Sequence, residues 1–252
     1  MQRLSAGALV LLTGILTGCA LPPASPLAPL ATGTRVFSAN DKMAWEAVTF
    51  PGKVRTAFSQ QRHDGRDSVQ AESKGSVSML RQRLGVPPDA LGLLNFSWQV
   101  ETLLPDADMA EPGKGDSPVR LVLAFEGDRQ KFSSRNAMLS ELSQALTGEP
   151  LPYATLMYVW SNTKPVGTVI VHPRTDRIRK IVVDSGPQHL RQWRHHQRDL
   201  RADFERAFGE APGALQALAI MTDSDNTRSQ TRAWYGEIQL SEPLNPPSHA
   251  QK

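Results

Sequence analysis

The segment Leu94-Asn95-Phe96-Ser97-Trp98-Gln99-Val100-Glu101 alternates apolar and polar residues without a break and gives the clearest indication of the fold. Successive side chains of a β-strand point to opposite faces, so the four apolar residues share one face. The pattern therefore predicts a strand whose one face is buried against a second layer. The segment 118–125 is more continuously apolar and predicts a central strand.

Strand patterns also fill most of the chain on either side of this stretch. We predict further strands at 153–160, 167–171, 177–183, 218–221 and 233–240, with weaker ones at 54–58, 68–72 and 76–80. Roughly ten strands separated by turn residues are typical of a β-sandwich, and long runs of strands without intervening helices fit a sandwich with inserted helices better than alternating β-α units. The expected fold is mainly β, a jelly-roll-like antiparallel sandwich of two sheets with two inserted helices.

The first of these helices is predicted over Ser134–Leu146 and the second ends at Phe208, before Gly209. Each has apolar residues at helical spacing. In the first these are Met138, Leu139, Leu142 and Leu146; in the second they are Leu190, Trp193, Leu200, Phe204 and Ala207. The start of the second helix is left open between Pro187 and His195.

Four arginines lie at spacings of 3, 4 and 3 in the segment before Phe208: Arg191, Arg194, Arg198 and Arg201. On a continuous helix they would form one stripe, which would be either a solvated face or a surface for lipid headgroups or an anionic glycan.

The N-terminal segment points to the cell envelope. A basic residue and a short apolar run precede Leu16-Thr17-Gly18-Cys19, which contains the only cysteine of the chain. This ending resembles a bacterial lipobox, which implies removal of residues 1–18 and lipidation of Cys19. In the sorting rule of Gram-negative bacteria, Ala20 implies delivery to the outer membrane, where we expect the domain to face the periplasm. Residues 19–33 are rich in proline and predict an extended tether, 34–241 the sandwich domain and 242–252 a disordered tail.

Composition excludes several classes of function. A net charge of +3 over 252 residues, with no basic block, does not favour nucleic acid as a partner. Zinc-ligand spacings, phosphate-binding loops, dinucleotide fingerprints and the Gly-x-Ser-x-Gly motif are all absent from the sequence.

Several short motifs resemble a bacterial family of secreted and lipid-anchored proteins that is known as a domain of unknown function. The motifs span residues 98–101, 114–120, 158–160, 203–209, 221–227 and 234–238. The resemblance covers roughly residues 37–240 and implies a jelly-roll sandwich of the carbohydrate-binding-module type. It implies no established activity.

The turn Asp223-Ser224-Asp225-Asn226-Thr227 is the best candidate for a site, because it offers two carboxylates and an amide between two predicted strands. These residue types are also ordinary turn formers that bind the local backbone. A plain turn, a polar ligand site and a weak Ca²⁺ site at Asp223 and Asp225 all remain open.

Arg120 interrupts an otherwise apolar strand, and Asp116 lies just before it. Because an unpaired buried charge is costly, we expect Arg120 to pair with Asp223 or Asp225, either as a structural ion pair or as the floor of a polar pocket. Trp160 is the aromatic residue expected to join them in contacting a ligand.

These patterns favour an outer-membrane lipoprotein whose domain is a non-catalytic binding module for a saccharide or another polar envelope ligand. The first alternative is a polysaccharide-active enzyme that uses a pair of carboxylates among Glu101, Glu126 and Glu237. The second is a structural envelope protein that binds a periplasmic protein. No cofactor is expected apart from the possible Ca²⁺.

Overall fold

The computed structural model of the chain describes residues 34–38 and 45–243. The predicted signal segment, the tether with Cys19, and residues 244–252 of the predicted tail lie outside the described residues. The boundaries of the predicted domains and the lipidation of Cys19 therefore stay predictions. No helix in the described part has the length and apolar character needed to cross a bilayer.

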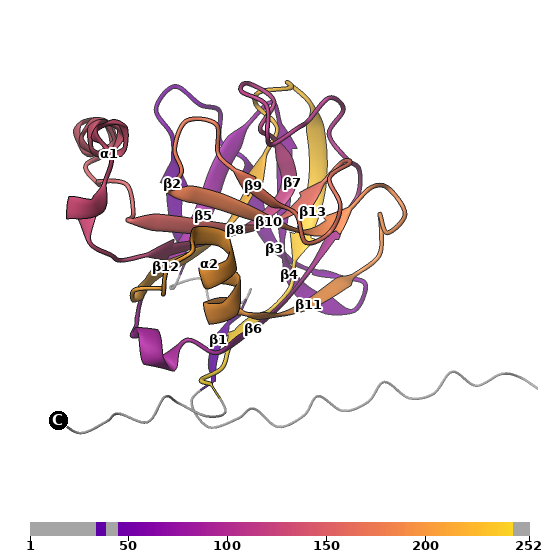
Figure 1. The fold of residues 1–252 in the computed structure, drawn as a ribbon. Helices are drawn as coiled ribbons and strands as arrows, with labels where there is room; N and C mark the ends of the chain where they lie inside the picture. Colours follow the sequence, from indigo (N-terminus) through magenta and orange to yellow (C-terminus); the bar gives the residue numbers. More distant parts are fainter. Residues whose placement is uncertain (1–33, 39–44, 244–252) are drawn as a thin grey trace, which may run out of the picture. The chain divides into compact units, whose positions relative to one another are not determined.

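Two sheets, here called sheet A and sheet B, face each other as a sandwich (Figure 1). Sheet A runs in the order β1 (Arg35–Phe37), β14 (Ile238–Leu240), β6 (Leu93–Val100), β13 (Gln230–Tyr235), β4 (Arg66–Lys74) and β3 (Ala57–His63), and β11 (Arg194–Asp199) also pairs with β6. Sheet B runs in the order β2 (Glu46–Thr49), β5 (Val77–Val86), β12 (Leu215–Asp223), β7 (Ser117–Phe125), β8 (Ala154–Ser161), β10 (Ile178–Ser185) and β9 (Val169–Val171). Two short 3₁₀ turns lie at Pro88–Ala90 and Arg129–Lys131.

The predicted mainly-β sandwich of two sheets with two helices is confirmed, with one departure from antiparallel pairing. Strand β10 runs parallel to β8. The chain leaves β8, forms the edge strand β9, and returns antiparallel to it as β10, which occupies the place between the two. The chain reverses direction between β8 and β9 and again between β9 and β10, so β10 runs in the same direction as β8.

The alternation that predicted β6 holds in the structure. Leu94, Phe96, Trp98 and Val100 are all buried, and they join the main core between the two sheets. Sheet B is apolar on its other face as well, where Val122, Val159, Val182 and Met221 belong to a second, smaller cluster. A sheet that is apolar on both faces has to be covered on both, so loops lie over this outer face.

The second predicted helix begins later than expected. It is α2 (Leu200–Phe208), and the segment before it is the strand β11, paired with β6 from Arg194 to Asp199. The arginine stripe on a helix is therefore wrong. In a strand, Arg194, His196 and Arg198 share one side, where they reach the buried carboxylates of Asp184 and Asp203. The Asp199 side chain then caps α2 by accepting from the backbone N–H of Ala202 at 3.0 Å.

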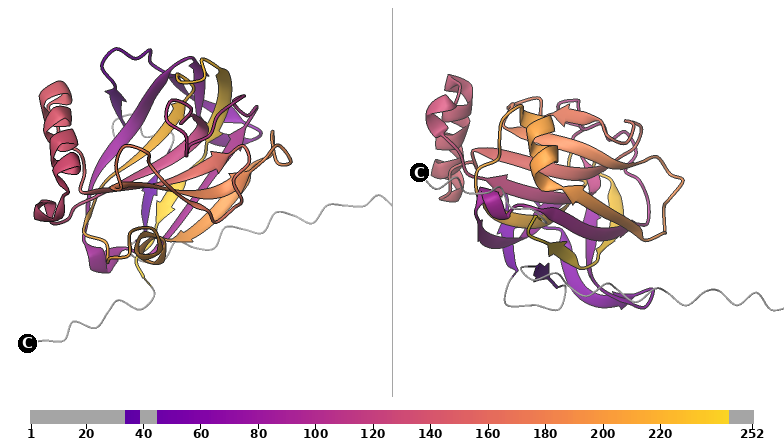
Figure 2. Two further views of the ribbon diagram at one scale, coloured as in Figure 1. Left: turned by 45° about the horizontal axis from the view of Figure 1, so that its top comes forward. Right: turned by 60° about the horizontal axis from the view of Figure 1, so that its bottom comes forward.

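The first helix, α1 (Ser134–Thr147), is confirmed and ends at Gly148, whose φ of 77° is the left-handed conformation that glycine adopts readily. Its orientation is the reverse of what the apolar spacing suggests. Met138, Leu142 and Leu146 are 60%, 52% and 60% exposed, whereas Asn136 and Ser140 are buried. Both views of Figure 2 show α1 standing off from the sheets.

Candidate functional site

A cleft of about 290 Å³ opens on the outer face of sheet B. We call it the sheet-B cleft. Its lining combines buried charged groups, apolar side chains and an exposed polar rim. The lining residues used below are Phe50, Lys53, Val77, Met109, Glu111, Arg120, His172, Arg174, Lys180, Met221, Asp223, Asp225 and Asn226. The volume is close to the lower end of the range for small-molecule sites, roughly 300–1,000 Å³.

An ion pair between neighbouring strands forms one part of the cleft floor. Arg120 of β7 donates from Nη2 to Asp223 Oδ2 of β12 at 2.8 Å, and both side chains are less than a tenth exposed. Arg120 Nη2 also donates to the backbone carbonyl of Gly115. Arg120 Nε and Asp223 Oδ1 are buried without a hydrogen-bond partner. The pair predicted from sequence is present, and it leaves hydrogen-bonding capacity unused at the base of the cleft.

The Asp223 carboxyl is electrostatically unusual. Burial raises its pKa well above the usual range, and neighbouring Asp225 and Asp116 act in the same direction, while Arg120 opposes them. The Arg120 guanidinium is therefore the principal group that stabilises the ionised form of Asp223.

A buried carboxylate behind the cleft holds the turn after β12 in place. Asp116 Oδ1 accepts from the Asn226 backbone N–H at 3.2 Å and from its side-chain amide at 2.7 Å. Asp116 Oδ2 accepts from the Thr227 N–H at 2.8 Å and from its hydroxyl at 2.7 Å. Burial alone would raise the pKa of Asp116, but the hydrogen bonds from Thr227 and Asn226 outweigh it and lower the pKa. The turn is thus fixed by a single ionised side chain.

Substitution Asp116→Asn should lower the free energy of unfolding by about 2–3 kcal/mol at pH 6, because an amide nitrogen would replace one of the two acceptor oxygens. The native pKa of Asp116 lies below its unfolded value, so its contribution is present above roughly pH 4 and is lost as the pH falls through the native pKa. Urea unfolding at pH 6 and pH 3 should show a smaller acid-induced loss in the variant. Glu111→Gln, an exposed change at the same cleft, is the control, and equal acid profiles for wild type and D116N would contradict the assignment.

A buried lysine forms the other part of the floor. Lys180 of β10 is 1% exposed, and its Nζ donates to the Met109 carbonyl at 3.1 Å. Among the described residues it forms no ion pair. Burial, and then the charge of Arg120, lowers the pKa of Lys180 to about 7. An ammonium with three donors thus has one hydrogen bond to an uncharged acceptor.

Three carboxylates come together at one side of the cleft. Oxygens of Asp116, Asp223 and Asp225 lie within 4.8 Å of one another. Each is already engaged: Asp116 by the turn, Asp223 by Arg120, and Asp225 by an ion pair with Lys53. A Ca²⁺ ion would have to compete with two protein cations for these oxygens, so the donor set is a poor fit to calcium.

The predicted site residues are brought together with one exception. Arg120, Asp223, Asp225 and Asn226 line the sheet-B cleft, and Asp116 is bonded directly to Asn226. Trp160 is 1% exposed within the main core between the sheets, where its Nε1 donates to the Gly186 carbonyl at 3.0 Å. That placement is on the opposite face of sheet B from the cleft. Whether any of these residues binds a ligand stays a prediction.

Sequence reasoning missed Lys180, His172, Arg174 and Lys53. For Lys180 a signal existed: it shares strand parity with Ile178 and Val182, both of which belong to the outer-face cluster. A lysine in an apolar row has the same need for a partner as Arg120. The other three lie in loops and are brought to the cleft only by the tertiary fold.

The three glutamates considered for glycosidase chemistry do not line the sheet-B cleft. Glu101 lies 3.6 Å from Arg232, Glu126 accepts from Gln216 at 2.6 Å, and Glu237 accepts from Gln239 at 2.6 Å. Each belongs to a separate surface contact, which gives the carboxylate-pair alternative no support.

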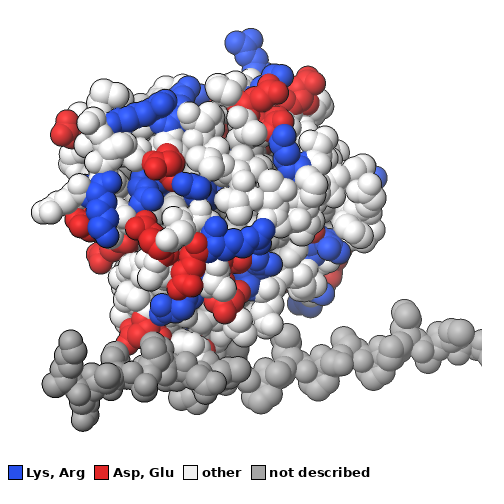
Figure 3. All heavy atoms as spheres, viewed as in Figure 1, with Lys and Arg blue, Asp and Glu red and all other residues white. Residues whose placement is uncertain are grey.

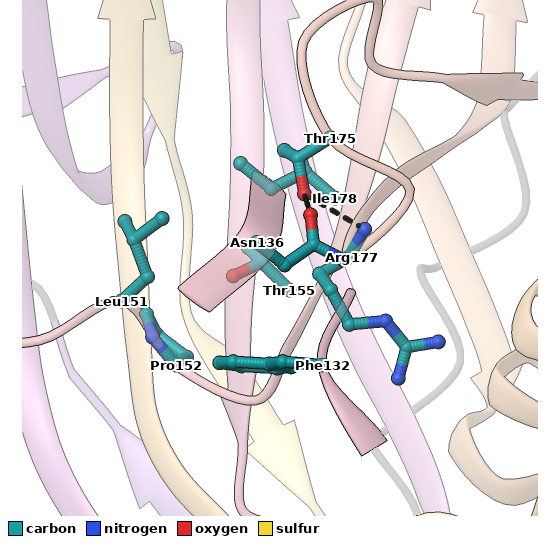
Figure 4. Close-up of a pocket in the computed structure, with 8 residues that line it drawn as sticks. All are labelled: Phe132, Asn136, Leu151, Pro152, Thr155, Thr175, Arg177 and Ile178. Atoms are coloured by element: carbon teal, nitrogen blue, oxygen red, sulfur yellow. Dashed lines mark hydrogen bonds between the residues drawn. The ribbon is translucent and has the colours of Figure 1, made fainter. Parts of the chain in front are cut away.

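A second hollow lies between α1 and sheet B (Figure 4). Its volume is about 10 Å³, which holds no more than a water molecule. Thr175 donates from its hydroxyl to Asn136 Oδ1 at 2.8 Å, and Asn136 Nδ2 donates to Asp176 at 2.6 Å. This hollow is where polar contacts anchor α1, which explains why the helix turns its polar side inward.

Charges on the face shown in Figure 3 are mixed, with lysine and arginine beside aspartate and glutamate. Such a surface produces no large field of one sign there.

Comparisons with known proteins identify a family and a set of distant structural likenesses. A family model described as a protein of unknown function, DUF3047, matches residues 43–239. No curated protein matches the sequence. Among solved structures, a family 11 carbohydrate-binding module from Clostridium thermocellum is similar at a TM-score of 0.43 and 8% identity, covering 87% of this chain and 100% of that one. An endoglucanase from Rhodothermus marinus is similar at 0.43 and 9%, covering 83% and 100%. At this similarity the structures bear on neither the ligand nor an activity of this chain.

Proposed function

The chain belongs to the DUF3047 family, and we propose that it is a non-catalytic binding module that holds a saccharide or another polar ligand in the sheet-B cleft. One observation carries this proposal: buried charges with unused hydrogen-bonding capacity underlie an open cleft. A buried charged group with an unused hydrogen-bonding atom lowers stability unless a partner satisfies it, and such groups are concentrated at functional sites.

The lining also suits a ligand that is both polar and partly apolar. Val77, Met109 and Met221 offer apolar surface, and half-buried Phe50 lies beside them. Charged and amide groups surround this surface. A sugar ring has the same combination, with C–H faces that pack on apolar groups and hydroxyls that form hydrogen bonds.

We further propose that the module is attached to the outer membrane through lipid on Cys19 and acts in the periplasm. The lipobox residues Leu16 to Cys19, Ala20 and the proline-rich segment 19–33 support this part of the proposal. The membrane would then be a partner through the lipid alone. Metabolic labelling with palmitate tests it: wild type should carry label and fractionate with membranes, and Cys19→Ser should do neither.

A glycan array tests the binding role. Wild type should be retained on a subset of saccharides without releasing any product, whereas Glu111→Trp, which places an indole at the cleft rim, should lose that retention. Glu141→Trp on α1 is the matched control and should bind as wild type does. New reducing ends or unsaturated products would favour the enzyme alternative. Silence on every saccharide would favour a protein partner.

A further inference from the structure

The charges that line the sheet-B cleft do not cancel. Asp225 pairs with Lys53, Asp223 with Arg120, and Glu111 with Lys114 just outside the lining. Two cations remain, Lys180 and Arg174, and neither has an ion pair among the described residues. Against them stands one carboxylate without an ion pair among the described residues, Asp116, which lies beside the cleft and accepts hydrogen bonds only from neutral groups of the turn. The cleft therefore keeps one positive charge in excess, and both unpaired cations belong to its lining.

His172 also lines the cleft, and the charges of both cations act on it. Burial, and then the charges of Lys180, Arg120 and Arg174, lowers the pKa of His172 to about 4. The imidazole is consequently neutral at pH 7, and its Nδ1 accepts from the Arg174 backbone N–H at 3.2 Å. Burial is the larger cause of this shift, and the three cations add a positive potential at this wall of the cleft, which favours an anion.

The two unpaired cations differ in access. Arg174 is exposed, so its guanidinium is free to contact a ligand directly. Lys180 is 1% exposed under the Met109 backbone. Below about pH 7, where its amine is protonated, it acts from beneath through a charge that water screens weakly.

The acidic groups set a limit on the charge of the anion. Asp223 and Asp225 line the same cleft, and their oxygens lie within 4.8 Å of each other. A dianion such as a phosphate monoester would face both carboxylates, whereas a single carboxylate can bind Arg174 with less repulsion. Hydroxyl groups on the same ligand would find acceptors in those carboxylates. The carboxylates can accept hydrogen bonds from hydroxyl groups, and the unpaired cations can bind one carboxylate. The cleft therefore suits a polyol that carries a carboxylate.

We propose that the ligand of the sheet-B cleft is an acidic saccharide of the uronic-acid class, with its carboxylate bound by Arg174 above the buried charge of Lys180. This assignment rests on the proposed binding function and names the chemistry of its ligand. A neutral saccharide would leave both cations without a partner, and planar guanidinium–carboxylate pairing gives the selectivity.

Trigalacturonate and its fully methyl-esterified form are the matched probes, because they share every hydroxyl and differ only at the carboxyl groups, which are charged in the acid and neutral methyl esters in the other. With the full-length chain, we expect calorimetric titration to show at least tenfold tighter binding of the acid than of the ester. Arg174→Met should remove that difference, Arg174→Lys should retain part of it, and Arg135→Met on α1 should leave it unchanged. Raising the salt concentration should weaken binding of the acid and not of the ester.

Equal affinity for acid and ester, both lost in Glu111→Trp, would overturn the acidic-saccharide assignment while the proposed function stands. Failure of both probes together with silence of the glycan array would overturn the proposed function as well. Inorganic phosphate should displace trigalacturonate at least tenfold less well than monomeric galacturonate does. Equal displacement would show a general anion site and would overturn the saccharide assignment.

Discussion

Arg120→Met should lower the free energy of unfolding by about 3–5 kcal/mol, because it leaves the Asp223 carboxyl buried among other carboxylates without its guanidinium. The Arg120–Asp223 pair joins β7 to β12 in the centre of sheet B. Without the Arg120 guanidinium, the folded state bears the full desolvation cost of the buried Asp223 carboxyl. The Gly115 carbonyl loses its donor in the same variant.

The double variant Arg120→Met/Asp223→Asn should recover most of that loss, since a neutral pair has no uncompensated charge. Urea unfolding of wild type, both single variants and the double variant at pH 7 gives the coupling free energy. Arg174→Met, which removes an arginine from the rim of the same cleft, should change stability by less than about 0.5 kcal/mol. Additive losses in the double variant would contradict the structural account of the pair.

Lys180→Met should have the opposite effect and make the protein more stable, by roughly 2–4 kcal/mol at pH 6. A methionine fills similar space among Val122, Met157 and Val182 without a buried ammonium. The loss of the hydrogen bond to the Met109 carbonyl offsets part of the gain, by about 1 kcal/mol.

The pH dependence of this effect has a defined sign. The native pKa of Lys180 is lowered to about 7, by burial and then by Arg120, whereas Asp223 and Asp108 act in the opposite direction. Between pH 7 and roughly pH 10 the unfolded chain therefore binds more protons at Lys180, and the contribution of this residue to the stability of wild type rises with pH. In Lys180→Met that rise should be absent, so the two proteins should converge at high pH.

Denaturant unfolding at pH 6 and pH 9.5 measures both effects. Lys53→Met removes an exposed lysine from the same cleft and should reproduce neither the stabilisation nor the loss of pH dependence. A Lys180→Met variant that is less stable than wild type at pH 6 would show that the lysine has a structural role in the fold.

Local pattern was enough to predict much of the fold. The alternation around Trp98 identified β6 because the two faces of that strand meet different environments. It failed for β11, where Arg194 and His196 bond the buried Asp184 at 2.9 and 2.7 Å. Arg194 and His196 alternate along the strand because they bond a buried carboxylate elsewhere in the fold. The local sequence does not distinguish this arrangement from a row of basic residues on a helix.

The two parts of the cleft floor, Arg120 and Lys180, differ in how clearly the sequence marks them. Arg120 was identified as a site residue because a charge inside an apolar strand needs a partner. Lys180 lies in the alternating row of Ile178 and Val182, which is a signal of the same kind, but Arg177 and Arg179 flank that row and mask it. In the folded chain, the loop between β6 and β7, which contains Met109, lies against Lys180 and makes it a buried charge.

Saccharide retention by Lys180→Met shows whether a ligand uses the buried charge of the sheet-B cleft. We expect this variant to be more stable than wild type and to lose retention on the acidic saccharides of the array. A stabilised Lys180→Met variant that is retained as strongly as wild type would contradict this expectation.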